Sequence, residues 1–583
     1  MRYKLIDGSA NDINDIVGTV LRNRGVEQPQ EYLTLTERCT NDYNDLDNID
    51  KAVQCFTNHF DNNDDIAILV DCDPDGYTSA ALIYKYIKNI DDQYPVYYLI
   101  HNNNKAHGLG KINDGDFEIP QGVKLLIVPD AGTNDTEECN KLIANGMDII
   151  ILDHHEAEEI AHHNQAIIVN NQLSNNYPNK DFSGAGVAYE FLRALDDHNW
   201  TICADKYLDL VALAQISDIM DLRSCATRYY VNKGLRNINS RMLQALIDAQ
   251  SFSMNDKINP TSIAWNITPI LNALIRIGSS EERELLFRAF IDDYEEFDYK
   301  KRSGEIIKEN IYDRAARLCK NAKARQDKIR DKVFNSLKNH VNYNDKVAIM
   351  EATDTDSGIV GLVAMKLSDS IKLPVVLLRD IGDGKFSGSL RNYDNSPIED
   401  LKELLNSTGL FKCQGHANAA GAEIAKDNIQ LARDILNIQL KDLTYDNTYL
   451  CDFEIDFDDM DVIFIINIAE YDWLWCTGIK EPKVAIKNIT VQRQDMKVQG
   501  KDMNSIFFEC NNIKYVAFKL SEDNPLLAFA NGWGDPEDEL VFDAVVTCGI
   551  NVYNGISQCQ CIIEDVTVIT QQNDYKEEDE EWN

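Results

Sequence analysis

The feature that most constrains the fold of this chain is a series of short, uninterrupted apolar runs between residues 64 and 170. The runs read "DDIAILV", "YPVYYLI", "GVKLLIVPD", "MDIIILD" and "QAIIVN", and helix-like or loop segments separate them. Strands that are apolar on both faces are typical of a parallel sheet that helices cover on both sides. We therefore predict a mostly parallel α/β sheet in this part of the chain.

Several domains are expected, because 583 residues exceed what one hydrophobic core supports. A second α/β unit opens at "KVAIMEATD", and beyond residue 445 strands follow one another without helices, which favours a small barrel or sandwich. The predicted segments are an N-terminal helical region without strands (1–60), an α/β domain (61–275), a connector segment (276–345) whose long helix covers 303–340, a second α/β domain (346–443), a C-terminal β-barrel (444–570) and an acidic tail (571–583).

The composition argues against several classes of protein. No run of about 18 apolar residues is present, and the start "MRYKLIDGSANDIND" has no apolar core, so we expect neither a membrane span nor export. The fourteen cysteines contain no CxxC pair and are expected to be reduced, without structural zinc. The net charge of −39 argues against binding of nucleic acid.

One segment runs against this acidity. Residues 300–332 hold twelve Lys or Arg and five Asp or Glu, a net charge of +7. A solvated charged helix explains this segment as well as a binding surface does, and the sequence leaves both interpretations open.

Acidic and imidazole side chains directly follow three of the apolar runs. Because ligands of open parallel sheets bind beyond the carboxyl ends of the strands, these side chains should face one crevice. They are Asp71, Asp73 and Asp75 in "DCDPDG", Asp130 after "LLIVP", and Asp153, His154 and His155 after "IIIL".

Carboxylates gathered in one crevice repel one another unless cations lie between them. Carboxylates and imidazoles without thiolates suit Mn²⁺ or Mg²⁺, and five or more ligands are enough for two ions roughly 3.5–4 Å apart. Asp218, within the apolar "ALAQISDIMDL", is a further candidate ligand. Taken alone, "DCDPDG" also fits a solvated turn or a calcium loop, although position 82 is Leu where such a loop needs Glu, and Asp130 alone fits a helix cap.

These motifs together resemble the DHH phosphoesterase superfamily, whose name-giving motif corresponds to Asp153-His154-His155. "DCDPDG" is similar to its first motif, Asp130 to its second and Asp218 to its fourth. Within the superfamily the chain most resembles the RecJ single-stranded-DNA exonucleases, through "YPNKDFSGAGVAYEFL", "DSGIVGLVAMKLSD", "GSLRN" and "GHANAAGAEI". The resemblance covers residues 60–570 and implies a DHH domain, a connector helix, a DHH-associated domain and an OB-fold.

The resemblance implies a metal-dependent 5′→3′ exonuclease that hydrolyses single-stranded DNA to 5′ mononucleotides by two-metal catalysis, in DNA recombination or repair. No separate protein base is then required. Asp130 would bridge the two ions, Asp71 would lie at the edge of the site, and Asp153 would hold an imidazole. The implied metal ligands are Asp71, Asp73, Asp75, Asp130, His154, His155 and Asp218, and the implied catalytic residues are Asp130, Asp153, His154 and His155.

The resemblance also implies a device that holds a 5′ phosphate, because guanidinium groups and small-residue loops suit phosphate oxygens. Its residues would be Arg276, Ser389, Arg391 and His416, although each arginine alone also fits a surface ion pair. Where the family usually has an Arg before Gly-Tyr-Gly, this chain has Asn104, with Lys105 beside it as the candidate substitute. Strict dependence on a 5′ phosphate therefore stays open.

Single-stranded DNA is the expected partner, and a single-strand-binding protein or a helicase is a candidate for delivering it. Lys323, Arg325 and Lys328 of the basic segment would contact the strand and release its counterions. We expect a monomer without membrane contact in the cytoplasm of a bacterial cell or of a phage-infected host.

Two other functions remain as alternatives. The first is a DHH-type phosphoesterase for short oligonucleotides or cyclic-dinucleotide products, against which the connector and the barrel-like region argue, since an OB-fold engages single strands. The second is a non-catalytic replication scaffold, against which the filled ligand positions argue.

Overall fold

The computed structural model describes residues 1–6, 15–103, 106–110, 115–199, 201–301, 303–352, 355–394, 396–445, 448–553 and 555–569. The chain divides into two compact units. We call residues 31–445 with 473–479 the α/β unit, and residues 1–30 with 446–472 and 480–583 the β unit.

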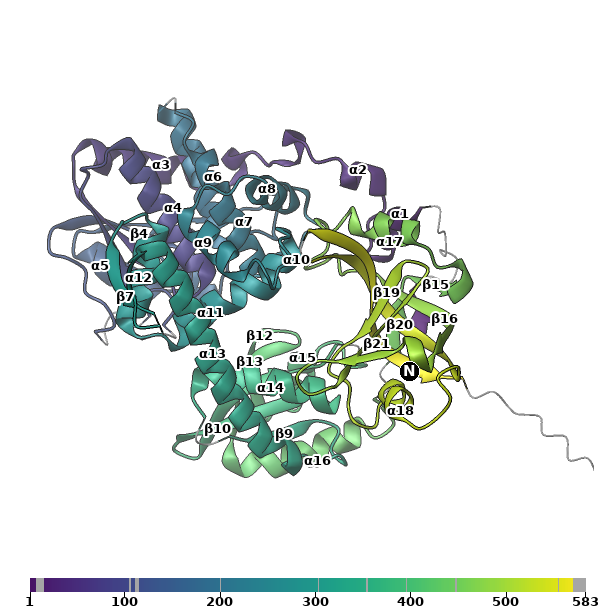
Figure 1. Cartoon of the computed structure of the whole chain (residues 1–583). Helices are drawn as coiled ribbons and strands as arrows, with labels where there is room; N and C mark the ends of the chain where they lie inside the picture. The colour runs from purple at the N-terminus through teal and green to yellow at the C-terminus, as the bar shows by residue number, and fades with distance from the viewer. Residues whose placement is uncertain are drawn as a thin grey trace, which may run out of the picture. The chain divides into compact units, whose positions relative to one another are not determined.

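The first sheet of the α/β unit has five strands, all parallel, in the order β3-β2-β4-β5-β6. The strands are β2 (Asp65–Val70), β3 (Val96–Ile100), β4 (Val123–Pro129), β5 (Asp148–Asp153) and β6 (Ile167–Asn170). Alternate side chains enter two separate cores. Ile68 and Ile127 pack with helices α3 (Ile49–Asp61), α4 (Pro74–Ile90) and α6 (Gly184–Asn199), whereas Leu69 and Leu126 pack on the other face with α5 (Thr136–Ala144). The predicted parallel sheet with two covered faces is confirmed (Figure 1).

The segment from residue 208 to residue 290 is mainly helical. Its main helices are α7 (Leu208–Ser217), α8 (Cys225–Leu235), α9 (Arg241–Gln250), α11 (Thr268–Ile277) and α12 (Ser280–Phe290). Most of their buried apolar residues join the same core as α4 and α6, so this helical layer thickens one side of the sheet.

The connector helix begins later than the sequence predicts. Residues 296–310 form an antiparallel hairpin, β7 (Glu296–Lys300) and β8 (Ile306–Asn310), whose turn contains Gly304 at φ 90°. Helix α13 (Ile311–Leu337) then starts where the Asn310 side chain accepts a hydrogen bond from the Asp313 N–H. The predicted start near residue 303 is therefore wrong. Its 27 residues pack against α9, α11 and α12 and against α14 (Ser357–Ile371) of the next sheet (Figure 1).

The second sheet of the α/β unit is mixed, in the order β12-β13-β11-β10-β9. Its strands are β9 (Ala348–Glu351), β10 (Val375–Gly382), β11 (Lys385–Arg391), β12 (Phe411–His416) and β13 (Ala419–Ala425). Helix α14 and the end of α13 cover one face, and α15 (Leu401–Ser407) and α16 (Ile429–Gln439) cover the other. This sheet is the second predicted α/β region.

The β unit contains a seven-stranded sheet in the order β15-β16-β20-β21-β19-β18-β17. The strands are β15 (Phe453–Asp456), β16 (Lys483–Gln492), β17 (Lys497–Gln499), β18 (Ser505–Cys510), β19 (Ile513–Ala517), β20 (Glu539–Tyr553) and β21 (Ile556–Val568). Helices α1 (Ile16–Asn23), α17 (Val462–Ala469) and α18 (Pro525–Asn531) accompany it.

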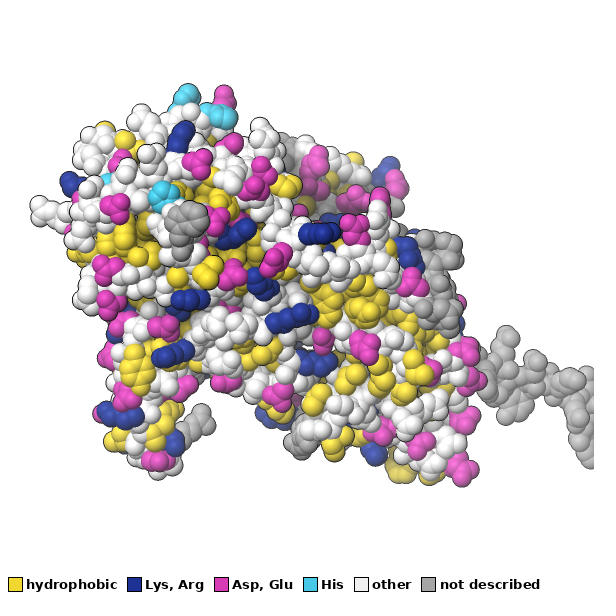
Figure 2. Space-filling view, turned by 90° about the horizontal axis from the view of Figure 1, so that it is seen from above, with side chains coloured by type: hydrophobic (Ala, Val, Ile, Leu, Met, Phe, Trp, Pro, Cys, Tyr) yellow, Lys and Arg dark blue, Asp and Glu magenta, His cyan; other side chains and the backbone are white. Residues whose placement is uncertain are grey.

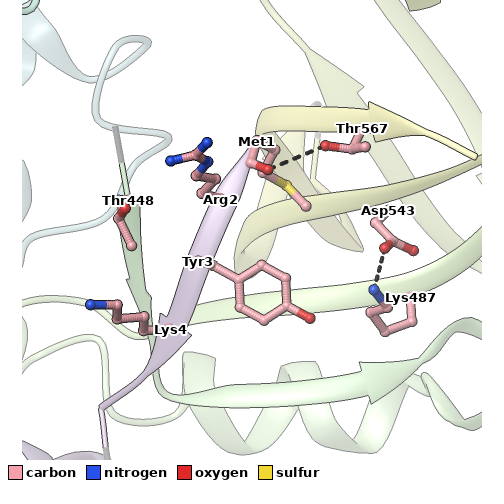
Figure 3. A pocket seen from close by; sticks show the side chains of 8 residues that line it. All are labelled: Met1, Arg2, Tyr3, Lys4, Thr448, Lys487, Asp543 and Thr567. Carbon is pink, nitrogen blue, oxygen red and sulfur yellow. Dashed lines mark hydrogen bonds and ion pairs between the residues drawn. The ribbon is translucent and has the colours of Figure 1, made fainter. Parts of the chain in front are cut away.

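The first residues of the chain belong to the β unit. Strand β1 (Arg2–Leu5) pairs in parallel with β14 (Thr448–Cys451), so the prediction that residues 1–60 lack strands is wrong at its start. Figure 3 shows β1 lining a pocket of about 490 Å³, where Lys487 and Asp543 form an ion pair. The pairing joins segments more than 440 positions apart, which local sequence patterns do not reveal.

On the face in Figure 2, Lys and Arg side chains are interspersed with acidic, polar and apolar ones. Among the described residues, no helix combines the length and the apolar composition needed to cross a membrane. Cys39 and Cys225 are paired as a disulfide, contrary to the expectation that every cysteine is reduced.

Candidate metal centre and adjoining pocket

The predicted acids and imidazoles meet at the carboxyl edge of the parallel sheet. Residues 71–75 follow β2, Asp130 follows β4, and His154 and His155 follow β5. Asp218 caps the C-terminal end of α7. Donor atoms of three groups lie within 4.8 Å of one another: Asp130, His154 and His155; Asp75, His154 and Asp218; and Asp71, Asp73 and Asp130.

The first motif places its carboxylates through the start of α4. Asp73 caps this helix, and its side chain accepts a hydrogen bond of 2.9 Å from the Gly76 N–H. Asp75 lies in the first turn, where its two oxygens accept hydrogen bonds from the N–H groups of Gly184 (2.7 Å) and Ala185 (2.8 Å) at the start of α6. These bonds fix the direction of the Asp75 carboxylate although it is almost fully buried.

Asp130 occupies a strained and crowded position. Its φ of 64° lies in the left-handed region, which a non-glycine residue adopts at an energetic cost. Helix α6 begins against it, because a Cβ on Gly184 would lie 2.5 Å from the Asp130 Cβ. Within the described part of the chain, neither buried carboxylate oxygen of Asp130 has a hydrogen-bond partner. Such a group is costly in a folded protein unless a ligand satisfies it.

Asp153 holds the second histidine of the motif. Its Oδ1 accepts a hydrogen bond of 2.7 Å from the backbone N–H of His154 and lies 2.8 Å from His155 Nδ1. Its Oδ2 accepts a hydrogen bond of 3.1 Å from the Thr133 N–H. The imidazole of His155 therefore directs Nε2 away from Asp153, in the arrangement common among metal-binding histidines.

His154 lies among three carboxylates. Its Nε2 is 3.2 Å from Asp130 Oδ1, 3.3 Å from Asp218 Oδ2 and 3.8 Å from Asp75 Oδ2. His154 Nε2 makes no hydrogen bond to any described residue. The nitrogen and the three carboxylate oxygens are therefore close together without being bonded to one another. Burial and the charge of His155 lower the pKa of His154 to about 4, which leaves a neutral imidazole.

Burial and mutual repulsion destabilise the charged forms of several carboxylates of the centre. Burial, followed by repulsion from Asp73, raises the pKa of Asp75 to about 7. Burial, with repulsion from Asp75 and Asp73, raises the pKa of Asp218 to about 8, and burial with the Asp75 charge raises the pKa of Asp130 well above its ordinary value. For Asp153, burial opposes the shift, but the bond to His155 and its charge hold the pKa far below the usual range. Asp153 therefore keeps its negative charge, whereas burial and mutual repulsion oppose the charged forms of Asp75, Asp130 and Asp218.

Two histidines that the sequence analysis did not single out complete this edge. His101 directly follows β3, is buried, and contacts Asp116 and, at 3.7 Å, Asp71. His107 Nδ1 lies 2.8 Å from Asp71 Oδ2, and although burial acts against it, Asp71 raises the pKa of His107 to about 10. The rule that functional groups follow strand ends would have found His101, had we applied it to "YPVYYLI" as well.

A pocket of about 330 Å³ adjoins the centre and joins the two sheets of the α/β unit. Asp71, Asp73 and His107 line one side, and the predicted substrate-binding residues Arg276, Ser389 and Arg391 line it too. Gly361 of α14 makes room for Arg391, because a Cβ at position 361 would lie 2.7 Å from Arg391 Nη2. Burial and the neighbouring Arg276 charge lower the pKa of Arg391, because both disfavour the charged form of its guanidinium.

The remaining predicted residues do not line this pocket. His416 is exposed on β12. On α13, Lys323 is paired with Asp327, Arg325 Nη2 lies 2.8 Å from Glu282 Oε2, and Lys328 is exposed. Lys105 and Asn104 lie outside the described residues, as does the acidic tail.

Comparison with known proteins agrees with this arrangement. Residues 65–215 match the model of the DHH family, N-terminal domain, and residues 344–442 match that of the DHHA1 domain. The chain is 36% identical over 584 residues to YorK, a prophage-derived protein of Bacillus subtilis described as a single-strand DNA-specific exonuclease, with 98% of each chain covered. It is 25% identical over 466 residues to the single-stranded-DNA-specific exonuclease RecJ of Haemophilus influenzae, covering 76% of this chain and 77% of that protein.

A solved structure shares the fold. RecJ from Thermus thermophilus, crystallised with Mn²⁺, superimposes with a TM-score of 0.70 at 17% identity, over 97% of this chain and 79% of that one. The fold and the histidine-carboxylate centre are those of a DHH protein with a DHHA1 domain. More narrowly, the chain belongs to the family of RecJ-like single-strand DNA-specific exonucleases.

The raised pKa values predict how the metal-free protein responds to pH. Unfolded Asp titrates near pH ~3.9, whereas Asp75 and Asp218 have pKa values of about 7 and about 8 in the folded chain. Their contribution to stability is thus complete at low pH and is lost as the pH rises through 7 and 8. We expect the unfolding temperature of chelator-treated protein to fall between pH 6 and pH 9, and Mn²⁺ to restore it most at pH 9.

The control is Asp130→Asn, which removes one of the repelling charges and should make the fall shallower. An unfolding temperature that is the same at both pH values without metal would contradict the electrostatic description of the centre.

Proposed function

We propose that the protein is a metal-dependent 5′→3′ exonuclease that hydrolyses single-stranded DNA to 5′ mononucleotides, in DNA recombination or repair. The observation that carries the proposal is that one pocket of about 330 Å³ is lined both by carboxylates of the candidate metal centre and by Arg276 and Arg391. This volume lies at the lower end of small-molecule sites and suits one terminal nucleotide. The names of the relatives agree with single-stranded DNA as the substrate.

The residues present fit divalent ions. The carboxylate oxygens of Asp130 and Nε2 of His154 are buried atoms without hydrogen-bond partners among the described residues, and each can bind a metal ion. The groups of candidate ligands at this centre contain carboxylates and imidazoles but no thiolate. The ligands would be Asp73, Asp75, Asp130, His154, His155 and Asp218, with Asp71 at the edge and Asp130 between two ions, Mn²⁺ or Mg²⁺. Bound there, the ions would supply positive charge for the phosphate and for the attacking and leaving oxygens.

The protein itself would position these groups and the substrate. Asp153 would keep His155 oriented through Nδ1, and the N–H groups of Gly184 and Ala185 would keep Asp75 oriented. Arg276, Ser389 and Arg391 would hold a 5′ phosphate, since a buried guanidinium binds phosphate oxygens in pairs. The terminal nucleotide would then lie between the phosphate anchor and the metal centre, so that the first linkage is the one presented for hydrolysis.

The other predicted parts keep their place in the proposal. The seven-stranded sheet of the β unit would be the OB-fold that engages single-stranded DNA. The segments 61–275, 276–345, 346–443 and 444–570 remain the proposed domains, and a single-strand-binding protein or a helicase remains a candidate partner. The protein would act as a monomer, in the cytoplasm of a bacterial cell or of a phage-infected host, where its DNA substrate is found.

Product analysis tests the proposed reaction. A long single strand, labelled at either end, is incubated with Mn²⁺ or Mg²⁺ and either the natural protein or Asp130→Ala. We expect mononucleotides to appear first from the 5′ end and the variant to lose activity by at least about 100-fold, because the shared ligand is gone. Hydrolysis of dinucleotides with intact long strands would instead support the short-oligonucleotide phosphoesterase, and metal binding without any hydrolysis would support the scaffold.

Substitution of Arg391 tests the phosphate anchor. In Arg391→Ala, kcat/KM for a 5′-phosphorylated strand should fall about 10- to 100-fold, whereas a 5′-hydroxyl strand should be affected much less, because only the former loses a charged hydrogen bond. Lys412→Ala removes an exposed cation of the same sheet and is the matched control. Equal losses on both strands would show that Arg391 does not contact the 5′ phosphate.

The salt dependence of binding tests the connector helix. The Arg325 partner, Glu282, also accepts a hydrogen bond from the Ser279 N–H, three residues beyond Arg276, so the middle of α13 passes near the anchor. Neutralising Lys323, Arg325 and Lys328 together should weaken binding of single-stranded DNA and lower the salt slope by up to about 2, at ~0.7 per phosphate contact. Neutralising Lys385, Lys412 and Lys426 changes the net charge equally and should leave the slope nearly intact. A slope that is unchanged in the α13 variant would exclude this helix from the binding surface.

A further inference from the structure

Trp265 is an aromatic residue that the fold leaves exposed. It lies in a π-helical turn, Ile263–Ile267, directly before α11. Ile263 and Ile267 are buried in the core, whereas Trp265 is 77% exposed. Turns of this kind are uncommon and often occur at functional sites. Two isoleucines thus fix the turn in the core, and the turn presents an indole ring to solvent.

The turn that carries Trp265 is linked to the end of α7 beside the metal centre. Thr268 is the first residue of α11, and its Oγ1 lies 3.2 Å from the Oγ of Ser217. Ser217 is the last residue of α7 and directly precedes Asp218, a candidate metal ligand. Trp265 therefore stands three residues before a direct contact with the segment that carries this ligand.

A second exposed apolar side chain directly follows Asp218. Ile219 is 64% exposed, and its φ of 60° lies in the left-handed region. Its N–H donates a hydrogen bond to the Ile216 carbonyl, and the next residue closes a second bond to α7, in the turn that commonly ends a helix with glycine. A β-branched residue is strongly disfavoured in this conformation. Stability alone therefore does not account for an exposed isoleucine at this position.

Helix α11 runs from this apolar end of the site to the phosphate anchor. Thr268 and Asn272 are half-buried and Arg276 is exposed, whereas most residues between them are buried. Positions four residues apart share one face of a helix, and Arg276 at the end of this face lines the pocket. At ~1.5 Å per residue, Trp265 lies about 16 Å from Arg276 along the helix, with Thr268 between them.

We propose that Trp265 is a substrate-binding residue on which a base of the strand stacks, on the 3′ side of the hydrolysed linkage, with Ile219 as a second apolar contact. This inference rests on the proposed exonuclease function. A strand held by its 5′ phosphate at Arg276, with its first linkage at the metal centre, would continue past Asp218 toward Trp265. Aromatic rings stack on bases of any sequence, as an exonuclease that proceeds along a strand requires. Because even closely stacked nucleotides advance ~3.4 Å each, the base concerned lies within about five nucleotides of the 5′ end.

The dependence on chain length separates a base contact from a structural role. In Trp265→Ala, kcat/KM on a 5′-phosphorylated strand of about twelve nucleotides should fall about 10- to 100-fold, the usual contribution of one stacked base. A dinucleotide anchored by its 5′ phosphate would end at the metal centre, so its hydrolysis should be unchanged. Trp265→Phe keeps an aromatic face and should retain most of the activity on the long strand. Tyr343→Ala removes an exposed aromatic ring from the segment after α13 and is the matched control.

Abasic nucleotides locate the stacked base. A single abasic nucleotide is placed in turn at each of the first few positions after the 5′ end. At the position that Trp265 contacts, it should cost the natural protein as much as Trp265→Ala does, and the two changes together should cost no more than either alone. Binding of a single strand should also quench tryptophan fluorescence in the natural protein, and much less in Trp265→Phe.

Two results would overturn the proposal. The first is an additive loss at every abasic position together with slower hydrolysis of dinucleotides by Trp265→Ala, because the indole would then act on the fold or on the metal centre. The second is an equal fluorescence quench in the natural protein and in Trp265→Phe. A natural protein that cleaves no strand but shows the Trp265-dependent quench would contradict the exonuclease function and support the stacking contact.

Discussion

Electrostatic repulsion among buried carboxylates is the constraint on which the rest of this structure depends. Strands β2 and β4 and the end of α7 bring Asp75, Asp130 and Asp218 to one edge of a sheet. Neither carboxylate oxygen of the buried Asp130 has a hydrogen-bond partner among the described residues. The backbone strain at Asp130 and the glycine at position 184 serve the same arrangement, because both let α6 and β4 approach closely enough to hold the carboxylates together. A fold that selection shaped for stability alone would not retain this conflict.

The second sheet turns this centre into a site for a defined part of a polymer. Arg391 is carried by β11 and Arg276 by α11, and both line the pocket that begins at Asp71 and Asp73. Helix α13 packs against α11 and α14, so it fixes the two halves of the pocket at one spacing. If Arg276 and Arg391 hold the 5′ phosphate as proposed, a packed helix that sets their distance from the centre also sets which linkage is hydrolysed.

Sequence reasoning predicted the parallel sheet and the residues at its edge well, because apolar runs that end in acids carry local information. The Asp71–Asp75 motif, Asp130 and the Asp153–His155 motif could all be found from the strands that precede them. Sequence reasoning failed where the deciding contact is distant along the chain, or where one composition suits both a strand and a helix. The pairing of β1 with β14 joins segments more than 440 positions apart. The hairpin before α13 has a charged composition that suits a helix equally. His107 escaped notice because the carboxylate that it contacts, Asp71, lies 36 residues earlier in the chain.

The net charge of −39 and a polyanionic substrate can be reconciled within the α/β unit. Several basic side chains of α13 already have acidic partners: Asp327 pairs with Lys323, and Glu282 pairs with Arg325. Arg276 and Arg391 line one pocket, where burial and the Arg276 charge lower the pKa of Arg391, so a bound anion would favour its charged form. In the proposed exonuclease, an acidic surface would oppose non-specific binding of DNA, while the cations of the pocket would retain a strand end. An acidic chain and binding of DNA at one site are therefore compatible. The acidity would also make the binding of DNA more selective for that site.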